Sequence, residues 1–272
     1  MKKTIKTCYQ DRAQDEWRRL IKDNFHRLEF KTTLHFLKKY LPKEGLILDA
    51  GGGPGRYTIE LAKQGYEVVL LDLTPKLLRI AKKKIKKAKV EDKVTDIVEG
   101  SIVDLSKFPD NSFEAVLCLG GPLSHVEGEK KRQKAVSELI RVAKKGAPIF
   151  VSVMGRLGLL IETPMYWPDE IKPREHFRSL WQAGDDQAWR WEYYCHFFLP
   201  EELKKLFAST GKTEIVDCVG LEGLAHAKRK ISQLASGSPQ AWRNWQEAHL
   251  ELCTHPAVFA TSNHMMIILK KK

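Results

Sequence analysis

Short apolar runs alternate with amphipathic segments over most of the chain. Apolar runs without polar alternation predict strands buried on both faces, as in a parallel sheet. Apolar residues at intervals of three and four follow most of these runs and predict helices packed against that sheet. The alternation predicts an α/β fold with a doubly wound, seven-stranded, mostly parallel sheet. The expected strands are residues 46–49, 67–72, 94–99, 114–119, 148–154, 213–219 and 263–269.

An acid and three glycines lie between the first strand and a helix expected over residues 57–64. Glycine lets the backbone approach a ligand closely, because no Cβ stands in the way. A strand, a glycine turn and a helix N-terminus together form an edge of the size that binds a nucleotide. The four residues of this motif are Asp49, Gly51, Gly53 and Gly55.

The spacing of the glycines separates three kinds of binding turn. A dinucleotide fingerprint, G-x-G-x-x-G, needs a glycine where Arg56 stands. A P-loop ending at Gly211-Lys-Thr213 needs a glycine where Leu206 stands. The third pattern, acid-x-Gly-x-Gly-x-Gly, is fully matched by Asp49, Gly51, Gly53 and Gly55.

A second acid, Asp72, ends the next strand about where a βαβ nucleotide site places its ribose-binding carboxylate. A carboxylate at this point accepts hydrogen bonds from both ribose hydroxyls and repels a 2′-phosphate. The helix after it is expected to begin with Thr74 as N-cap and Pro75 at its first position. Asp72 alone is also compatible with a surface or helix-capping role.

Together these motifs, with Phe108-Pro-Asp-Asn-Ser-Phe113 before the fourth strand, resemble class I S-adenosylmethionine-dependent methyltransferases over about residues 40–155. The small-molecule branch that includes ubiquinone and menaquinone methyltransferases is the most similar. The resemblance implies a Rossmann-like fold whose last strand runs antiparallel beside the sixth, and S-adenosylmethionine as cofactor. Ser101 stands where the family usually has an acid, and Glu114 where it usually has an aspartate. The implied cofactor residues are Asp49, Gly51, Gly53, Gly55, Asp72, Leu73, Ser101, Ile102 and Leu119.

Ahead of the sheet, residues 9–41 carry apolar positions at helical spacing and predict one or two helices. They resemble the N-terminal helices that cover the cofactor in small-molecule members of the family. Arg27 could pair bidentately with the methionine carboxylate. A surface pair between Arg27 and Glu16 or Glu29 is an equal alternative.

Residues 156–198 break the α/β alternation. They are rich in tryptophan, tyrosine and phenylalanine and are interrupted by prolines, which predicts an inserted helical, aromatic lid over the acceptor site. The chain is therefore expected to be one methyltransferase domain over residues 1–272. Its parts are N-terminal cap helices (1–42), a cofactor-binding core (43–155), the lid (156–198), and the C-terminal part of the sheet with inserted helices (199–272).

Methyl transfer from a sulfonium needs orientation above all, and it needs a base only if the nucleophile arrives protonated. His125 follows the fourth strand at the carboxyl edge of the sheet and is the main candidate base. A helix-capping or backbone-bonded histidine is the alternative. His196 and Tyr9 are further candidates, each with a packing role as its alternative.

The net charge of +12 raises the question of nucleic acid. Much of it lies in residues 82–89, on a helix whose opposite face can be buried. The expected buried stripe is Leu77, Leu78, Ile80, Ala81 and Ile85. The basic run lacks interleaved aromatic residues and no RNA-binding motif is visible, so a solvated face is favoured over an RNA footprint.

The five cysteines are scattered without a C-x-x-C pair, which supports neither a disulfide framework nor a metal site. No apolar stretch is long enough to span a membrane, and the N-terminus lacks the apolar core of a signal peptide. These observations favour a reducing cytoplasm.

The chain is thus expected to transfer a methyl group from S-adenosylmethionine to a small-molecule acceptor. An RNA or protein methyltransferase is the alternative within the class. A non-catalytic module that binds a nucleoside is the alternative from another class, and a dehydrogenase is weakened by Arg56 at the third glycine position.

Overall fold

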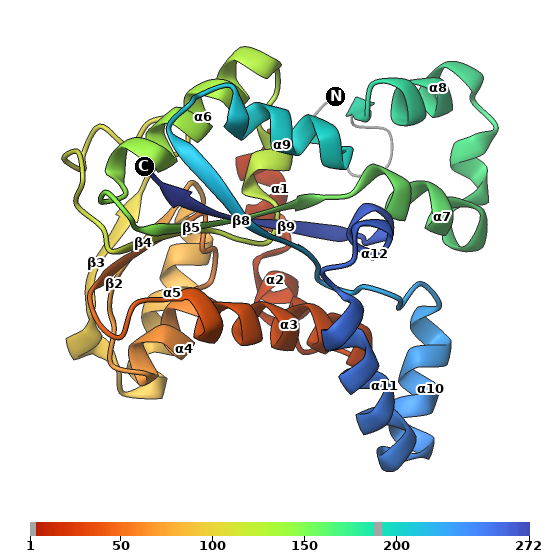
Figure 1. Ribbon diagram of the computed structural model, residues 1–272, viewed down its shortest axis with the longest axis horizontal. Coiled ribbons are helices and arrows are strands. Elements are labelled where there is room, and N and C mark those ends of the chain that lie inside the picture. The colour runs from red at the N-terminus through yellow and green to blue at the C-terminus, as the bar shows by residue number, and fades with distance from the viewer. Residues whose placement is uncertain (1–3, 188–191) are drawn as a thin grey trace.

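A seven-stranded sheet with the order β3-β2-β1-β4-β5-β9-β8 runs through the protein (Figure 1). This computed structural model describes residues 4–187 and 192–272. Strands β1 to β5 are parallel, and β9 is antiparallel to both β5 and β8. The predicted fold and the antiparallel last strand are confirmed. The strands are β1 Leu46–Ala50, β2 Glu67–Asp72, β3 Val94–Glu99, β4 Ala115–Cys118, β5 Pro148–Met154, β8 Thr213–Gly220 and β9 His264–Lys271.

Each central strand supplies two hydrophobic clusters, one on each face of the sheet. In β1, Leu48 belongs to one cluster and its neighbour Ile47 to the other, and β4 divides Val116 and Leu117 in the same way. Successive side chains of a strand point to opposite faces, so a strand covered on both faces must be apolar throughout. This is why the strand sequences show no polar alternation.

Helices cover both faces, and the N-terminal segment forms three of them where one or two were expected. Arg12 breaks the segment after the first helix, and residues 20–23 separate the second from the third. The helices outside residues 156–198 are α1 Ile5–Asp11, α2 Ala13–Arg19, α3 Asn24–Tyr40, α4 Arg56–Lys63, α5 Pro75–Ala88, α6 Glu129–Val142, α9 Pro200–Ala208, α10 Lys228–Gly237, α11 Pro239–Leu252 and α12 Pro256–Thr261, with 3-10 turns η1 Glu91–Lys93 and η2 Pro122–His125.

The lysine-rich helix α5 is amphipathic as predicted. Its buried residues are Leu77, Leu78, Ile80, Ala81 and Ile85. Lys82, Lys83, Lys86 and Lys87 are exposed on the other side. The positive run is therefore a solvated helix face.

Residues 156–198 form an extension with its own small core instead of a regular βα unit. Helix α7 (Arg156–Tyr166), η3 (Pro168–Ile171) and α8 (Arg174–Gln182) precede a hairpin of β6 (Asp185–Gln187) and β7 (Tyr194–His196). Leu159, Leu180, Cys195 and Phe197 pack together at its centre. Trp189 and Trp191 lie outside the described residues.

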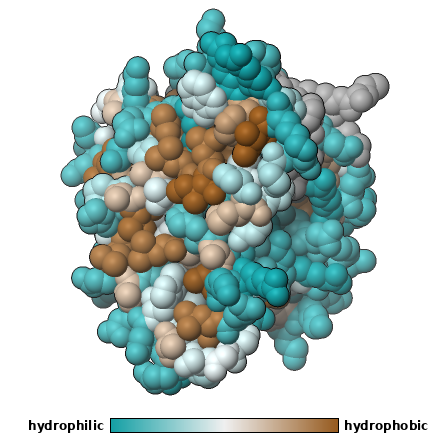
Figure 2. Space-filling view, turned by 90° about the vertical axis from the view of Figure 1, so that its right-hand side faces the viewer, coloured by the Kyte–Doolittle hydropathy of each residue, from teal (hydrophilic) through white to brown (hydrophobic). Residues whose placement is uncertain are grey.

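The side of the molecule that carries α7 and α10 shows apolar patches (Figure 2). Exposed apolar residues of α7 include Leu157, Ile161 and Met165, and Leu224 is also exposed. No helix among the described residues is long and apolar enough to cross a membrane.

Candidate active site

A cavity of about 330 Å³ lies at the carboxyl edge of the parallel strands. It is lined by the glycine turn after β1, by the residues that follow β2, β3 and β4, and by the N-terminal helices. This edge is where doubly wound sheets bind ligands, because the loops there diverge. The predicted residues that line it are Gly51, Gly53, Asp72, Leu73, Ser101, Ile102, Leu119 and His125.

The glycine turn requires its glycines for two reasons. Gly51 and Gly53 have φ of +81° and +56°, a region that residues with a Cβ rarely adopt. At Gly51 an added Cβ would also lie 2.5 Å from the ring of Pro122. The turn therefore presents bare backbone to the cavity.

Asp72 lies opposite this turn, at the end of β2. One carboxylate oxygen accepts a hydrogen bond from the backbone N–H of Gly53 at 3.0 Å, and the other accepts one from that of Thr74 at 2.7 Å. Burial raises the pKa of Asp72 to about 6. Each oxygen keeps a lone pair with which it can accept a further hydrogen bond.

Asp49 and Gly55, both in the predicted set of cofactor residues, do not line the cavity. The Asp49 side chain is fully buried beneath the turn and accepts a hydrogen bond from the Thr58 hydroxyl at 2.6 Å. Its other oxygen has no hydrogen-bond partner among the described residues, and burial raises the pKa of the Asp49 carboxyl to about 6. At Gly55 a Cβ would come within 3.3 Å of Ala81 on α5. Both residues therefore support the glycine turn on the side away from the cavity.

Arg27 does not line the cavity either. Its side chain is exposed and donates to the backbone carbonyl of Ile21 at 3.1 Å, away from the cavity. Among the arginines of the N-terminal helices, Arg19 is the one that lines the cavity. It is bound to Glu29 through two hydrogen bonds, of 2.7 and 3.1 Å, and to Glu16 at 3.0 Å.

Arg56 lines the cavity as well. Its guanidinium stacks on Trp17 at 4.0 Å from the ring centre and donates to the Trp17 carbonyl. Its Nε atom is buried without a hydrogen-bond partner.

His125 lies in the cavity wall with both ring nitrogens engaged. Nδ1 is 3.3 Å from the Tyr194 carbonyl, which only accepts, so this nitrogen carries the proton. Nε2 then accepts from the Tyr9 hydroxyl at 3.1 Å. Burial lowers the pKa of His125 to about 4. A weakly basic nitrogen whose lone pair is already occupied is a poor general base, so the geometry does not favour the predicted role.

None of the described residues in 156–198 lines this cavity, so the lid over the acceptor site stays a prediction. Tyr193 packs behind Tyr9 and His125 with ring centres at 6.0 and 5.3 Å. His196 is buried between Asp185, at 2.8 Å, and Glu202, at 2.7 Å. Its two nitrogens are both bound, so it holds the extension together and is not placed as a base.

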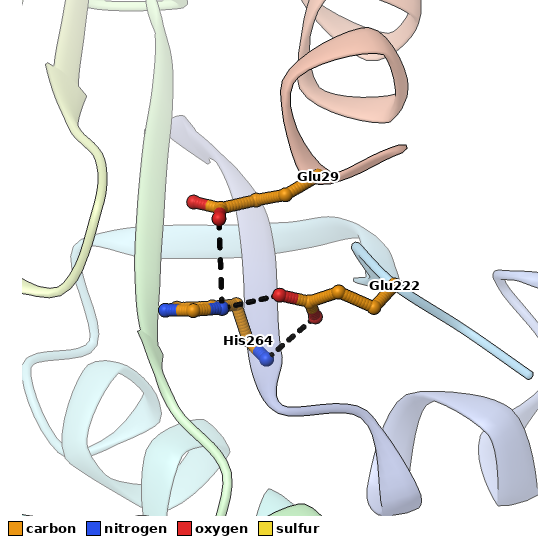
Figure 3. Close-up of side chains that lie close together, drawn as sticks. All are labelled: Glu29, Glu222 and His264. Atoms are coloured by element: carbon orange, nitrogen blue, oxygen red, sulfur yellow. Dashed lines mark hydrogen bonds and ion pairs between the residues drawn. The ribbon is translucent and has the colours of Figure 1, made fainter. Parts of the chain in front are cut away.

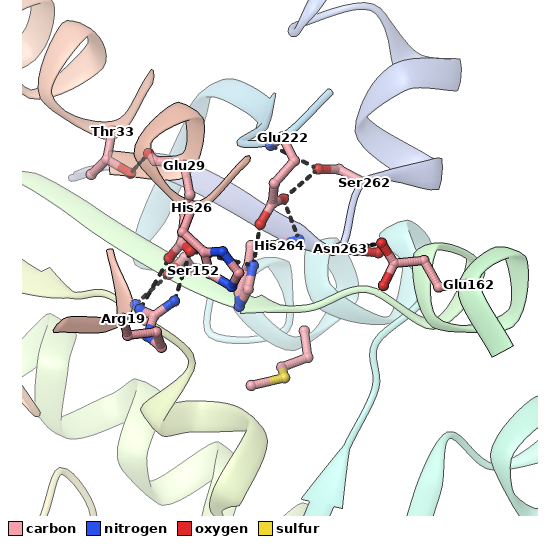
Figure 4. Close-up of polar contacts among 12 residues, drawn as sticks. Arg19, His26, Glu29, Thr33, Ser152, Glu162, Glu222, Ser262, Asn263 and His264 are labelled. Carbon is pink, nitrogen blue, oxygen red and sulfur yellow. Dashed lines mark hydrogen bonds and ion pairs between the residues drawn. The ribbon is translucent and has the colours of Figure 1, made fainter. Parts of the chain in front are cut away.

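A buried polar cluster beside the cavity was missed by the sequence reasoning. Arg19, Glu29, His264 and Glu222 lie in one continuous set of contacts (Figure 4). Glu16 and Arg19 stand one helical turn apart, a local signal that could have been noticed. His264 and Glu222 contact Glu29 only in the tertiary fold, and no spacing in the sequence indicates that these residues lie together.

Comparison with known proteins agrees with this geometry. Residues 47–146 match a family model described as a methyltransferase domain. The chain is 28% identical to the "probable methyltransferase ltbC" of Aspergillus luteorubrus over 78% of its own length and 76% of that protein. It is 29% identical to a glycine/sarcosine N-methyltransferase of Parasynechococcus marenigrum, over half of its own length and 47% of that enzyme.

A solved structure shares the fold. The S-adenosylmethionine-dependent methyltransferase of Methanosarcina mazei superposes with a TM-score of 0.60 at 21% identity, over 87% of this chain and 96% of that one. The family match falls on the part of the chain that builds the glycine turn, Asp72 and the loops after β3 and β4. Residues 47–146 thus form a methyltransferase domain, and the chain is similar in sequence to known methyltransferases.

Proposed function

We propose that the cavity holds S-adenosylmethionine along the sheet edge and that the enzyme methylates a small molecule placed beyond β4. The observation that carries this proposal is the distribution of polar groups along the cavity. A carboxylate stands at the ribose position, apolar side chains lie on the β3 side, and charged groups gather on the β4 side.

The chemistry of the lining fits the cofactor from one end to the other. Asp72 offers acceptors to the ribose hydroxyls, and Leu73, Ile102 and Ser101 offer an apolar slot with a polar rim to the adenine. Glu16 and Arg19 carry the opposite charges that a methionine ammonium and carboxylate need.

When bound, the cofactor supplies a methyl group activated by its sulfonium. The protein's own contribution is orientation and the exclusion of water. Tyr9 and Leu20 from the N-terminal helices close the cavity over the methionine end. With adenine toward β3, the methionine end points toward β4, so the acceptor would lie over β4, β5 and β9, which follow in the sheet order.

The RNA alternative rests on charge alone, and the basic face of α5 is solvated helix surface. We also propose a cytoplasmic location, which the five free cysteines favour because a reducing compartment keeps thiols unpaired.

One experiment tests the proposal and its alternatives together. The protein is incubated with methyl-labelled S-adenosylmethionine and a cell extract, and the label is separated by ultrafiltration. Label in the filtrate, absent with heat-denatured protein, supports a small-molecule acceptor. Label retained on protein or on nuclease-sensitive material would overturn it. Calorimetry with S-adenosylhomocysteine and NAD checks the cavity, and tight binding of NAD alone would favour a dehydrogenase.

A further inference from the structure

Three ionisable side chains from different parts of the chain meet at the sheet edge, and Figure 3 shows them converging. They are Glu29 from α3, Glu222 from the segment after β8, and His264 at the start of β9. Nδ1 of His264 bonds to a Glu222 oxygen and lies 3.9 Å from a Glu29 oxygen. The other Glu222 oxygen accepts from the His264 backbone N–H at 2.8 Å and from the Ser262 hydroxyl at 3.0 Å. The imidazole is thus held in one orientation.

This cluster lies on the side of the cavity where the acceptor is proposed to bind. His264 is paired in register with Met154 at the end of β5, and Met154 lies against Gly121 after β4. Arg19, which lines the cavity, bonds directly to Glu29. The charge of His264 also acts on His125 in the cavity wall.

The two nitrogens of His264 have different surroundings. Nδ1 carries a proton, because its partner Glu222 is a carboxylate and only accepts. Nε2 points away from Glu222 (Figure 3) and has no hydrogen-bond partner among residues 4–187 and 192–272. This nitrogen is not among the polar atoms that are fully buried without a hydrogen-bond partner, and the His264 side chain remains 15% exposed. Nε2 is therefore available to a ligand.

The charges of the cluster favour a histidine dyad over a metal centre. Arg19 already neutralises Glu29 through two hydrogen bonds, and the imidazolium form of His264 neutralises Glu222. A divalent cation at this point would have to displace Arg19 or face it at close range.

We infer that His264 is the general base of methyl transfer, that Glu222 positions it, and that the acceptor is therefore a hydroxyl compound of the phenol class. The inference rests on the proposed function. Neutral Nε2 would take the proton of the acceptor O–H. The oxygen would form the new bond to the methyl carbon as the carbon–sulfur bond breaks, and sulfur would keep that electron pair. The proton would remain on an imidazolium paired with Glu222.

The choice of a hydroxyl over an amine follows from the groups that face the acceptor side. In its protonated form, His264 carries an N–H at Nε2, on the side of the ring away from Glu222. This N–H stabilises an oxygen that becomes negative and repels an ammonium.

The pH dependence follows from the surroundings of His264. Burial alone would lower its pKa, but the Glu29 and Glu222 carboxylates outweigh burial and raise it to about 8. The base is therefore neutral and active above pH 8 and protonated below it. The titratable and charged groups that face it from the neighbouring elements are Arg19, His26, Glu29, His125 and Glu222.

A titration that needs no acceptor tests the dyad. The imidazole of His264 is followed by NMR in the unliganded protein and in Glu222→Gln, assigned through the signal lost in His264→Gln. A pKa near 8 that falls by at least about one unit in Glu222→Gln supports the dyad, because the variant removes the anionic partner. An unchanged pKa in a folded Glu222→Gln protein overturns it.

Kinetics with two phenols test the base and the acceptor class. At pH 8, 4-nitrophenol is largely phenolate, whereas 4-methylphenol, like tyrosine, keeps its proton. His264→Gln should lower turnover of 4-methylphenol by roughly 10²–10⁴ and that of 4-nitrophenol much less. The exposed His35→Gln is the matched control and should lower neither.

Each contrary outcome has a separate meaning. Equal loss on both phenols would make His264 a packing residue and overturn the base role. Transfer to glycine and to neither phenol would overturn the hydroxyl class and leave the proposed function in place. Activity that is lost in EDTA and restored by Mg²⁺ would replace the dyad by a metal site. Failure to bind S-adenosylhomocysteine at all would overturn the proposed function itself.

Discussion

Asp72 accepts a hydrogen bond from the backbone N–H of Gly53 at 3.0 Å, so the acid that ends β2 is fastened to the glycine turn that follows β1. The contact fixes the carboxylate where a ribose can reach it. We expect Asp72→Ala to weaken S-adenosylhomocysteine binding by about 1.5–3 kcal/mol, the range for hydrogen bonds to a charged group. Isothermal calorimetry measures this change. Asp92→Ala, at an exposed acid, is the control. Equal affinity of Asp72→Ala and the parent protein would remove Asp72 from the binding site.

Asp49 should make stability depend on pH. Burial raises its pKa from 3.8 to about 6, so the folded protein holds this proton at a pH where the unfolded chain has released it. A raised carboxyl pKa lowers the free energy of unfolding as the pH rises through this window, by about 3 kcal/mol for a shift of this size. Asp49→Asn can keep the Thr58 hydrogen bond and cannot ionise. Relative to the parent protein, its unfolding free energy in urea should gain about that amount between pH 3.5 and pH 7.5. A difference that does not vary with pH would contradict the assignment.

Most of the fold followed from local rules, and the site followed only in part. The glycine turn, Asp72 and the buried stripe of α5 depend on neighbouring residues and strand order, which a sequence displays directly. Arg19 was missed in favour of Arg27 because both stand on apolar-patterned N-terminal segments, and only the packing of these helices shows which one faces the cavity. His264 begins the antiparallel strand β9, and Glu222 lies in the segment that follows the neighbouring strand β8. No local sequence pattern shows that these two residues meet.

Arg19 and Arg27 provide a matched pair for testing the methionine end. Arg19→Lys keeps the charge but loses the two-pronged guanidinium geometry. We expect about a 10–100-fold weaker affinity for S-adenosylhomocysteine, equivalent to about 1.4–2.7 kcal/mol. Arg27→Lys should bind like the parent protein, because its side chain is exposed and away from the cavity. The opposite ranking of the two variants in calorimetry would restore Arg27 to the role that the sequence indicated.

The Tyr9 hydroxyl donates a hydrogen bond to Nε2 of His125. Removing this bond tests whether His125 has a structural role or acts as a general base. Tyr9→Phe removes the hydroxyl and leaves Nε2 of His125 without its partner. We expect a loss of about 1 kcal/mol in unfolding free energy and a change in turnover of less than a few fold, because the pKa of His125 is lowered to about 4 by burial. Chemical denaturation and initial rates measure the two effects. A loss of turnover above a hundredfold, with cofactor affinity intact, would return His125 and Tyr9 to the chemistry.

The extension over residues 156–198 should prove structural, and Arg156 is the place to test it. This buried guanidinium donates to the backbone carbonyls of Phe197 and Ala183 and to the carboxylate of Glu202, at 2.8–3.0 Å. It ties the start of α7 to the chain on both sides of the hairpin. Arg156→Met fills similar space but leaves the two buried carbonyls without this donor, which should cost about 1–3 kcal/mol of unfolding free energy, whereas Glu202 keeps His196 as a partner.

Turnover decides whether the extension is only structural or also forms a lid over the acceptor site. Since the described residues of 156–198 do not line the cavity, Arg156→Met protein that remains folded at low temperature should keep the parent kcat and KM. Trp181→Ala is the control for a change within the same segment, because Trp181 is 48% exposed and its removal should alter stability less than that of the buried Arg156. A raised KM for the acceptor in folded Arg156→Met protein, with unchanged cofactor affinity, would instead make the extension the lid that its aromatic sequence predicts.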